Sequence, residues 1–187
     1  MLTSILLAAA LGGLVVFVWG MISWMALPWH HAAYSPFTDE EAVVRALEAN
    51  APVTGVYGIP HGDCRGLTPE EKKAKQDAMM ERMKRGPLVF AVVVRRGAAG
   101  MGLYFVRGIV IGVVVSGVLA WLLSRAAVAG LLDRALFVAF AGLAGTAAVR
   151  LNEWNWHGFP TRYTVINIVD GFISWFLAGL AIAAVLP

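Results

Sequence analysis

Cysteine and charge are both scarce in this chain of 187 residues. Cys64 is the only cysteine, so an intrachain disulfide and a thiolate cluster for zinc or iron–sulfur are excluded. Charged residues make up 14% of the chain and hydrophobic residues 59%, which is far from the average of soluble domains. Because a soluble core cannot cover that much apolar surface, the composition predicts an integral membrane protein whose main partner is the lipid bilayer.

Catalytic and phosphate-binding motifs are also missing from the sequence. It holds no Gly-x-Ser-x-Gly, no Walker A loop and no His-Glu-x-x-His, so it offers no catalytic residues to name. The four histidines lack the spacing of a metal or haem site, and we therefore expect no cofactor. Fifteen basic residues stand against 12 acidic ones, a balance that does not favour nucleic-acid binding.

Four long apolar runs are present instead, and about 20 such residues suffice for a helix to cross roughly 30 Å of hydrocarbon. The first has no charge, ends at Pro28 and exceeds the ~7 to 15 apolar residues of a secretory signal, so we expect it to be a retained span. The predicted spans cover residues 2–27, 102–123, about 132–149 and 163–186.

The segment between the first two spans has the pattern of a small α+β domain. Thr38 with Glu41, and Thr68 with Glu71, have the spacing of capping boxes that begin helices over residues 39–49 and 69–85. Two short runs rich in β-branched and aromatic residues predict a pair of strands. These runs are residues 53–59 and 88–94.

The predicted fold class is a mainly α membrane protein. It is a bundle of four transmembrane helices with the small α+β domain inserted between helices 1 and 2. Residues 1–28 form transmembrane helix 1, residues 29–100 the extramembrane domain, and residues 101–187 helices 2 to 4. The polar and aromatic residues 150–162 are expected to form an interfacial loop between helices 3 and 4. Its aromatic members at the headgroup layer are Trp154, Trp156 and His157.

A polar layer is predicted within the membrane. Arg107 and Asp170 lie at similar depths, roughly 8 to 11 Å below one interface, and pairing would offset the cost of leaving either charge in hydrocarbon. Tyr163, Asn167, Asp170 and Ser174 share one face of the last helix. That face either lines a path for a proton, an ion or a small solute, or forms hydrogen bonds between helices, and we favour the second interpretation.

Small residues recur every four positions on the second span. Gly108, Gly112, Ser116 and Ala120 form a ridge of this kind. Such a ridge lets another helix approach closely, so we expect a helix crossing here, with a partner from the same chain or from another subunit.

Two functions remain open at this point. The favoured one is a non-catalytic accessory or assembly subunit that binds other membrane subunits or copies of itself, because packing faces are abundant and catalytic motifs are absent. The alternative is a small oligomeric transporter or channel that uses the polar face around Asp170. We expect a bacterial inner (cytoplasmic) membrane. Arginines near the membrane ends favour a cytoplasmic inserted domain without deciding its side, since the inserted segment exceeds the ~60 residues over which the positive-inside rule holds.

Overall fold

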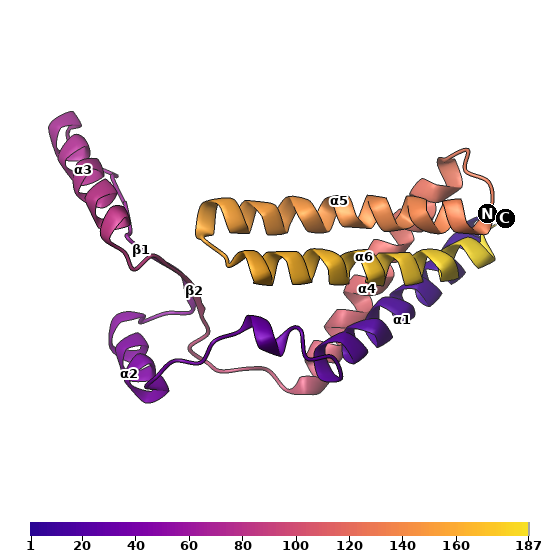
Figure 1. The fold of residues 1–187 in the computed structure, drawn as a ribbon, viewed down its shortest axis with the longest axis horizontal. Coiled ribbons are helices and arrows are strands. Elements are labelled where there is room, and N and C mark those ends of the chain that lie inside the picture. Colours follow the sequence, from indigo (N-terminus) through magenta and orange to yellow (C-terminus); the bar gives the residue numbers. More distant parts are fainter. Residues whose placement is uncertain (187) are drawn as a thin grey trace. The chain divides into compact units, whose positions relative to one another are not determined.

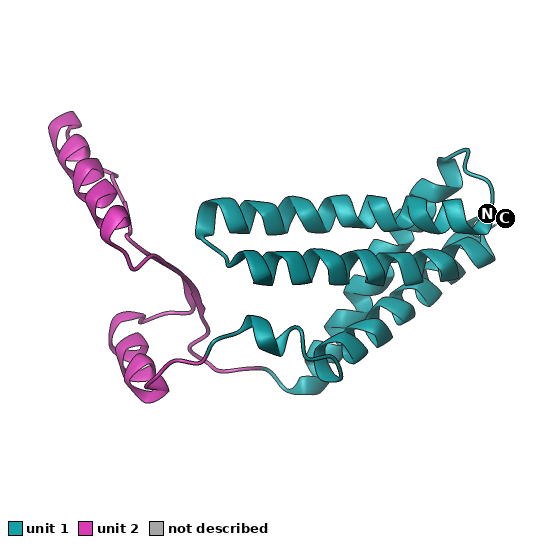
Figure 2. Ribbon diagram, viewed as in Figure 1, with its two compact units in different colours: residues 1–35, 99–187 teal, residues 36–98 magenta. Residues whose placement is uncertain are grey.

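The computed structural model describes residues 1–186, which divide into two compact units (Figure 2). The first, called the membrane unit here, comprises residues 1–35 and 99–187, and the second, called the inserted unit, comprises residues 36–98. Each is described by itself.

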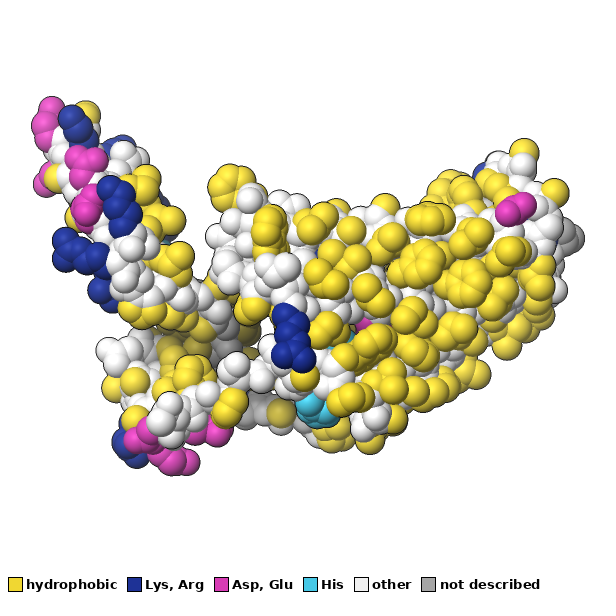
Figure 3. All heavy atoms as spheres, viewed as in Figure 1, with side chains coloured by type: hydrophobic (Ala, Val, Ile, Leu, Met, Phe, Trp, Pro, Cys, Tyr) yellow, Lys and Arg dark blue, Asp and Glu magenta, His cyan; other side chains and the backbone are white. Residues whose placement is uncertain are grey.

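The membrane unit consists of four long helices. They are α1 (Leu2–Met25), α4 (Met101–Arg125), α5 (Leu131–His157) and α6 (Thr161–Val185). The shortest has 24 residues and therefore rises by about 36 Å, and all four are apolar enough to cross a membrane. Hydrophobic side chains cover most of the visible face of these helices (Figure 3). The chain is thus suited to be an integral membrane protein with four spans.

The four helices are arranged as two pairs. Helix α1 packs beside α4, α6 packs beside α5, and α1 also contacts α6 (Figure 1). The four helices share one apolar core, at the end of the unit where both chain termini lie. The core residues are Ala8, Leu119, Ala120, Leu123, Val138, Ile182, Ala183 and Leu186.

Glycines bring α1 and α4 into backbone contact. A Cβ added to Gly13 would lie 2.5 Å from the Val113 nitrogen, and one added to Gly112 would lie 3.0 Å from the Gly13 carbonyl oxygen. Ser116, one turn further along α4, is fully buried. The small-residue ridge of α4 therefore faces α1 of the same chain.

The expected interfacial loop over residues 150–162 is wrong. Helix α5 continues to His157, so Trp154 and Trp156 belong to its last turns. Residues 150–157 contain no helix breaker, and Arg150 donates to Glu153 one turn later at 2.6 Å. The helix ends only at Gly158, whose φ of +71° is a left-handed cap that glycine adopts without strain.

The inserted unit contains the helices and strands that the sequence predicts. Helices α2 (Glu40–Asn50) and α3 (Pro69–Arg85) alternate with strands β1 (Gly55–Ile59) and β2 (Val89–Val93). The strands pair antiparallel, with Gly55 opposite Val93.

The capping of the two helices differs from the prediction in one case. Thr68 and Glu71 form the expected reciprocal capping box at the start of α3. Thr38 does not cap α2, because Asp39 takes that position and its carboxylate accepts from the Ala42 amide at 2.9 Å. A carboxylate is at least as good an N-cap as a threonine hydroxyl, and the adjacent acid therefore replaces it.

A hydrophobic core is missing from the inserted unit. Among its 63 residues, all of which the structure describes, Ala51 alone is buried. Most of the larger apolar side chains of its helices and strands are exposed, and Figure 3 shows Lys, Arg, Asp and Glu side chains among them. Its secondary structure is thus defined by capping and strand pairing and not by a packed interior.

The contact between α1 and α4 can be tested with two glycine variants. Gly13→Ala should lower the free energy of unfolding in detergent by about 1–3 kcal/mol, because its methyl group meets the backbone of Val113. Gly108→Ala is the matched control, since its added Cβ would lie 3.8 Å from Phe17, an ordinary contact distance. Thermal unfolding of both variants measures the difference, and equal midpoints would contradict the close crossing.

Candidate functional site

Asp170 is an acidic residue inside the membrane unit, and its carboxylate needs hydrogen-bond donors there. It lies in the middle of α6, and its side chain is 15% exposed. A carboxylate surrounded by apolar helices is costly unless hydrogen-bond donors converge on it. The donors around Asp170 therefore define the candidate site.

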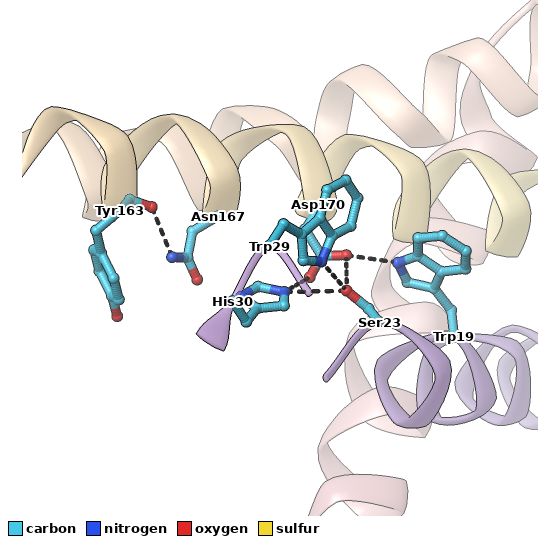
Figure 4. Close-up of polar contacts among 7 residues, drawn as sticks. All are labelled: Trp19, Ser23, Trp29, His30, Tyr163, Asn167 and Asp170. Carbon is cyan, nitrogen blue, oxygen red and sulfur yellow. Dashed lines mark hydrogen bonds and ion pairs between the residues drawn. The ribbon is translucent and has the colours of Figure 1, made fainter. Parts of the chain in front are cut away.

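Three side chains point at this carboxylate (Figure 4). Two belong to the last turns of α1, and the third belongs to the turn that follows this helix. Trp19 donates from its indole Nε1 to Oδ1 at 2.8 Å, and Ser23 donates from its hydroxyl to the same oxygen at 2.7 Å. His30 Nε2 lies 3.3 Å from Oδ2. Both carboxylate oxygens are thus bound by protein groups.

Local structure explains how the donors reach one point. Trp19 and Ser23 are four residues apart on α1 and therefore share a helix face. After α1 ends, the chain turns back, so that Trp29 Nε1 donates to the Ser23 hydroxyl at 3.0 Å. The His30 ring then stacks on Trp24, with centroids 4.0 Å apart and planes 6° from parallel. His30 is held at 1% exposure by these contacts.

The hydrogen-bond pattern determines where the imidazole proton lies. Ser23 gives its only proton to Asp170, so its oxygen can only accept from His30 Nε2, 3.0 Å away. Asp170 Oδ2 also needs a donor, so Nε2 carries the proton. Nδ1 is buried and has no hydrogen-bond partner among the described residues.

The predicted ion pair between Arg107 and Asp170 is not formed. Arg107 is exposed on α4, and the ion pairs of the described residues do not join it to Asp170. Helix α4 packs mainly on α1, and α6 approaches α1 from another side. The prediction rested on depth along the helices, which carries no information about direction around them.

The other residues of the predicted polar face lie outside this cluster. Asn167 donates from Nδ2 to the backbone oxygen of Tyr163 at 2.8 Å, within its own helix. Ser174 is half-buried one turn beyond Asp170, and no hydrogen bond of the described residues joins it to the cluster. The polar layer thus combines Asp170 with α1 and the following turn.

The sequence contained a signal for one of the Asp170 partners that the prediction did not include. In the first apolar run the hydroxyl residues are Thr3 and Ser4 at its start and Ser23 near its end. A hydroxyl near the end of an apolar helix, four residues after an indole donor, indicates an acceptor on a neighbouring helix. His30 gave no such signal, because its position depends on the turn after α1.

The cluster does not have the geometry of a nucleophilic site. In a serine triad, the serine and the carboxylate bind different nitrogens of the imidazole. Here Ser23 and Asp170 share Nε2 of His30, and Ser23 donates directly to Asp170. The arrangement ties α6 to α1 and leaves no activated nucleophile.

Two grooves flank α1 and are both apolar. One of about 510 Å³ runs between α1 and α4 and is lined by residues that include Phe17, Met21 and Phe105. The other, of the same volume, lies between α1 and α6 and includes Val18, Trp19 and Leu177. Surfaces of this kind suit lipid chains or other apolar helices.

The aromatic end of α5 contains the interfacial residues predicted from sequence. Trp154 donates from Nε1 to the hydroxyl of Thr161 at 3.1 Å and so joins α5 to the start of α6. Trp156 and His157 are exposed. Their side chains suit a headgroup layer.

The loop before α3 in the inserted unit contains an ion pair. Arg65 donates to the Asp63 carboxylate from Nε at 2.9 Å and from a terminal guanidinium nitrogen at 2.7 Å. This contact lowers the pKa of Asp63 to about 2. Groups of three or more His, Cys, Asp or Glu that could hold a metal ion are absent from the described part of the chain.

Comparisons of the sequence with family models and with curated proteins, and of the fold with solved structures, found no match. The function is therefore inferred from the contacts of the chain's own residues.

Loss of the Asp170 carboxylate should loosen the membrane unit. Asp170→Asn should lower the free energy of unfolding in detergent by about 1–3 kcal/mol, because at least one of the three converging donors loses its acceptor. Arg107→Gln is the control and should leave the thermal midpoint unchanged. An equal loss in both variants would show that the two charges depend on one another.

The Asp63–Arg65 contact predicts a pH dependence below neutrality. The pKa of Asp63 is lowered from 3.8 to about 2 in the folded chain, so the contact is fully present above pH 3.8 and is lost as the pH falls through about 2. Titration of the Asp63 carboxyl carbon by NMR measures this midpoint. Arg65→Gln should move it up towards 3.8, and an unchanged midpoint would contradict the assignment.

Proposed function

We propose that the chain is a non-catalytic membrane protein that serves as an accessory or assembly subunit of a larger membrane complex. The observation that carries this proposal is the absence of a core in the inserted unit, where Ala51 is the one buried residue of the 63 described. Chain segments of this size rarely stay folded without a core, a disulfide or a metal, unless a partner completes them.

The exposed apolar side chains of the two helices suit a protein partner. On α2 they include Val44 and Leu47, and on α3 they include Met80 and Met83. A helix of 11 residues such as α2 is marginal in water unless one face packs against another surface. Methionine side chains adapt to irregular surfaces, which makes the α3 pair a suitable contact for a partner.

The contacts of Asp170 weigh against the alternative of a small oligomeric transporter or channel. Both carboxylate oxygens are bound by protein donors, and His30 beside them is 1% exposed. A transport site would have to exchange these donors for water or an ion in each cycle. The bound carboxylate is better suited to fixing α6 against α1.

The proposal includes a location and an orientation. We assign the chain to a bacterial inner membrane with residues 36–98 in the cytoplasm. Three arginines of or next to the inserted unit support this side under the positive-inside rule, namely Arg85, Arg95 and Arg96. The opposite ends of the helices carry Arg125 and Arg134.

Purification in a mild detergent tests the proposal. The wild-type chain should copurify with a fixed stoichiometry of other membrane subunits, and trypsin should cleave α3 in the isolated chain but not in the complex. Met80→Ser with Met83→Ser should release the partner. Ala74→Ser with Ala78→Ser, on the opposite face of α3, should retain it.

A different result would favour the alternative function. If the chain purifies only with copies of itself and moves a solute across vesicles, and Asp170→Asn abolishes that movement without loss of folding, the accessory role is wrong.

A further inference from the structure

The strand pair of the inserted unit has an exposed apolar face. Val56 and Val92 are opposite one another in the antiparallel register and therefore lie on the same face. Their exposed fractions are 65% and 66%, which is high for two cross-strand neighbours of this kind. A two-stranded hairpin is marginally stable in water by itself, so contact with an apolar surface on this face would stabilise the strand pair.

Charge of one sign surrounds strand β2 in the sequence. From residue 82 to residue 124 the chain has no Asp or Glu. The cations of this stretch are Arg82, Lys84, Arg85, Arg95, Arg96 and Arg107. Strand β2 thus lies inside a purely basic segment, unlike the mixed charges of α2 and α3.

One of these arginines is joined to the end of the strand pair through its backbone. The Arg95 amide donates to the Thr54 hydroxyl at 3.0 Å, which joins the chain after β2 to the chain before β1. A shallow hollow of about 580 Å³ lies between these two segments and is lined by Val53, Val94 and both arginines. Exposed valines and arginines therefore line the same hollow.

The length of chain that follows limits how far this end can be from a bilayer. Arg96 is five residues before Met101, where the predicted span α4 begins. Five residues reach at most about 18 Å even when fully extended. The arginine pair is therefore held within reach of the headgroup layer, whatever the orientation of the inserted unit.

We propose that the strand pair is a docking site for the surface of a membrane that contains anionic phospholipids. The valines enter the apolar border of the headgroup layer, and Arg95 and Arg96 bind lipid phosphates. The charge is complementary to anionic headgroups, and juxtamembrane basic clusters bind them.

This site is independent of the partner proposed for α2 and α3. The strand pair can bind lipid in the absence of other subunits, so reconstitution of the purified chain tests it alone. A negative result here would leave the accessory role unaffected, and loss of the protein partner would leave lipid docking unaffected.

The test uses the full-length chain with Cys64→Ser and one spin label, reconstituted at low protein density. The label is placed at Val92→Cys, and at Val56→Cys as a second probe of the same face. Gln76→Cys on α3 is the control. Collisions with oxygen, which concentrates in lipid, and with a water-soluble nickel complex are measured in vesicles of phosphatidylcholine with or without phosphatidylglycerol.

With phosphatidylglycerol, the labels at 56 and 92 should lose most of their accessibility to nickel and gain accessibility to oxygen, while the label at 76 stays in water. High salt, or Arg95→Gln with Arg96→Gln, should reverse the change because charge attraction is screened or removed. Circular dichroism checks that each variant keeps its secondary structure.

Three results would overturn the proposal. The first is equal accessibility to nickel in both kinds of vesicle. The second is protection in phosphatidylcholine alone that is insensitive to salt. The third is protection that appears only at high protein density together with spin–spin broadening, which would assign the face to a second copy of the chain.

Discussion

The membrane unit depends on one constraint, the need to surround the Asp170 carboxylate with donors inside an apolar layer. Every donor that the structure provides comes from α1 or from the turn that follows it. Since α6 packs with α5, and α1 with α4, these bonds join the two helix pairs. They also fix the path of the chain as it leaves α1, because His30 can reach the carboxylate only if residues 28–30 turn back over Trp24. The Asp170 carboxylate thus determines both the contact between α1 and α6 and the path of the chain after α1.

The two ends of the membrane unit are held together by different forces. At the end with the termini, apolar residues of all four helices share a core, and glycines such as Gly13 and Gly112 bring backbones together further along α1 and α4. In lipid such contacts gain packing energy but little from the hydrophobic effect. Towards the other end the helix pairs are joined by charge-assisted hydrogen bonds, which are stronger where water is excluded. The polar cluster therefore acts where the shared apolar core does not reach.

The inserted unit follows a different principle from the membrane unit. Its helices are capped and its strands are paired, so local interactions define its secondary structure. It buries almost nothing, and its apolar side chains face outward from α2, α3 and the strand pair. These are the properties of a segment that is completed by the surfaces around it. The two proposed partners, protein subunits and the lipid surface, would each cover a different part of it.

The sequence by itself determined the four apolar helices, the strand pair and the capping box of Thr68 and Glu71, because each depends on residues close together in the chain. It also determined that Asp170 needs partners. Only the tertiary structure decided which residues these partners are. Depth along a helix follows from the residue count, whereas the direction of a side chain around the helix axis depends on how the helix packs against its neighbours. Arg107 was expected at the depth of Asp170, but it is exposed on another helix. His30 contacts Asp170 because the chain turns after α1, and no local sequence pattern predicted that turn.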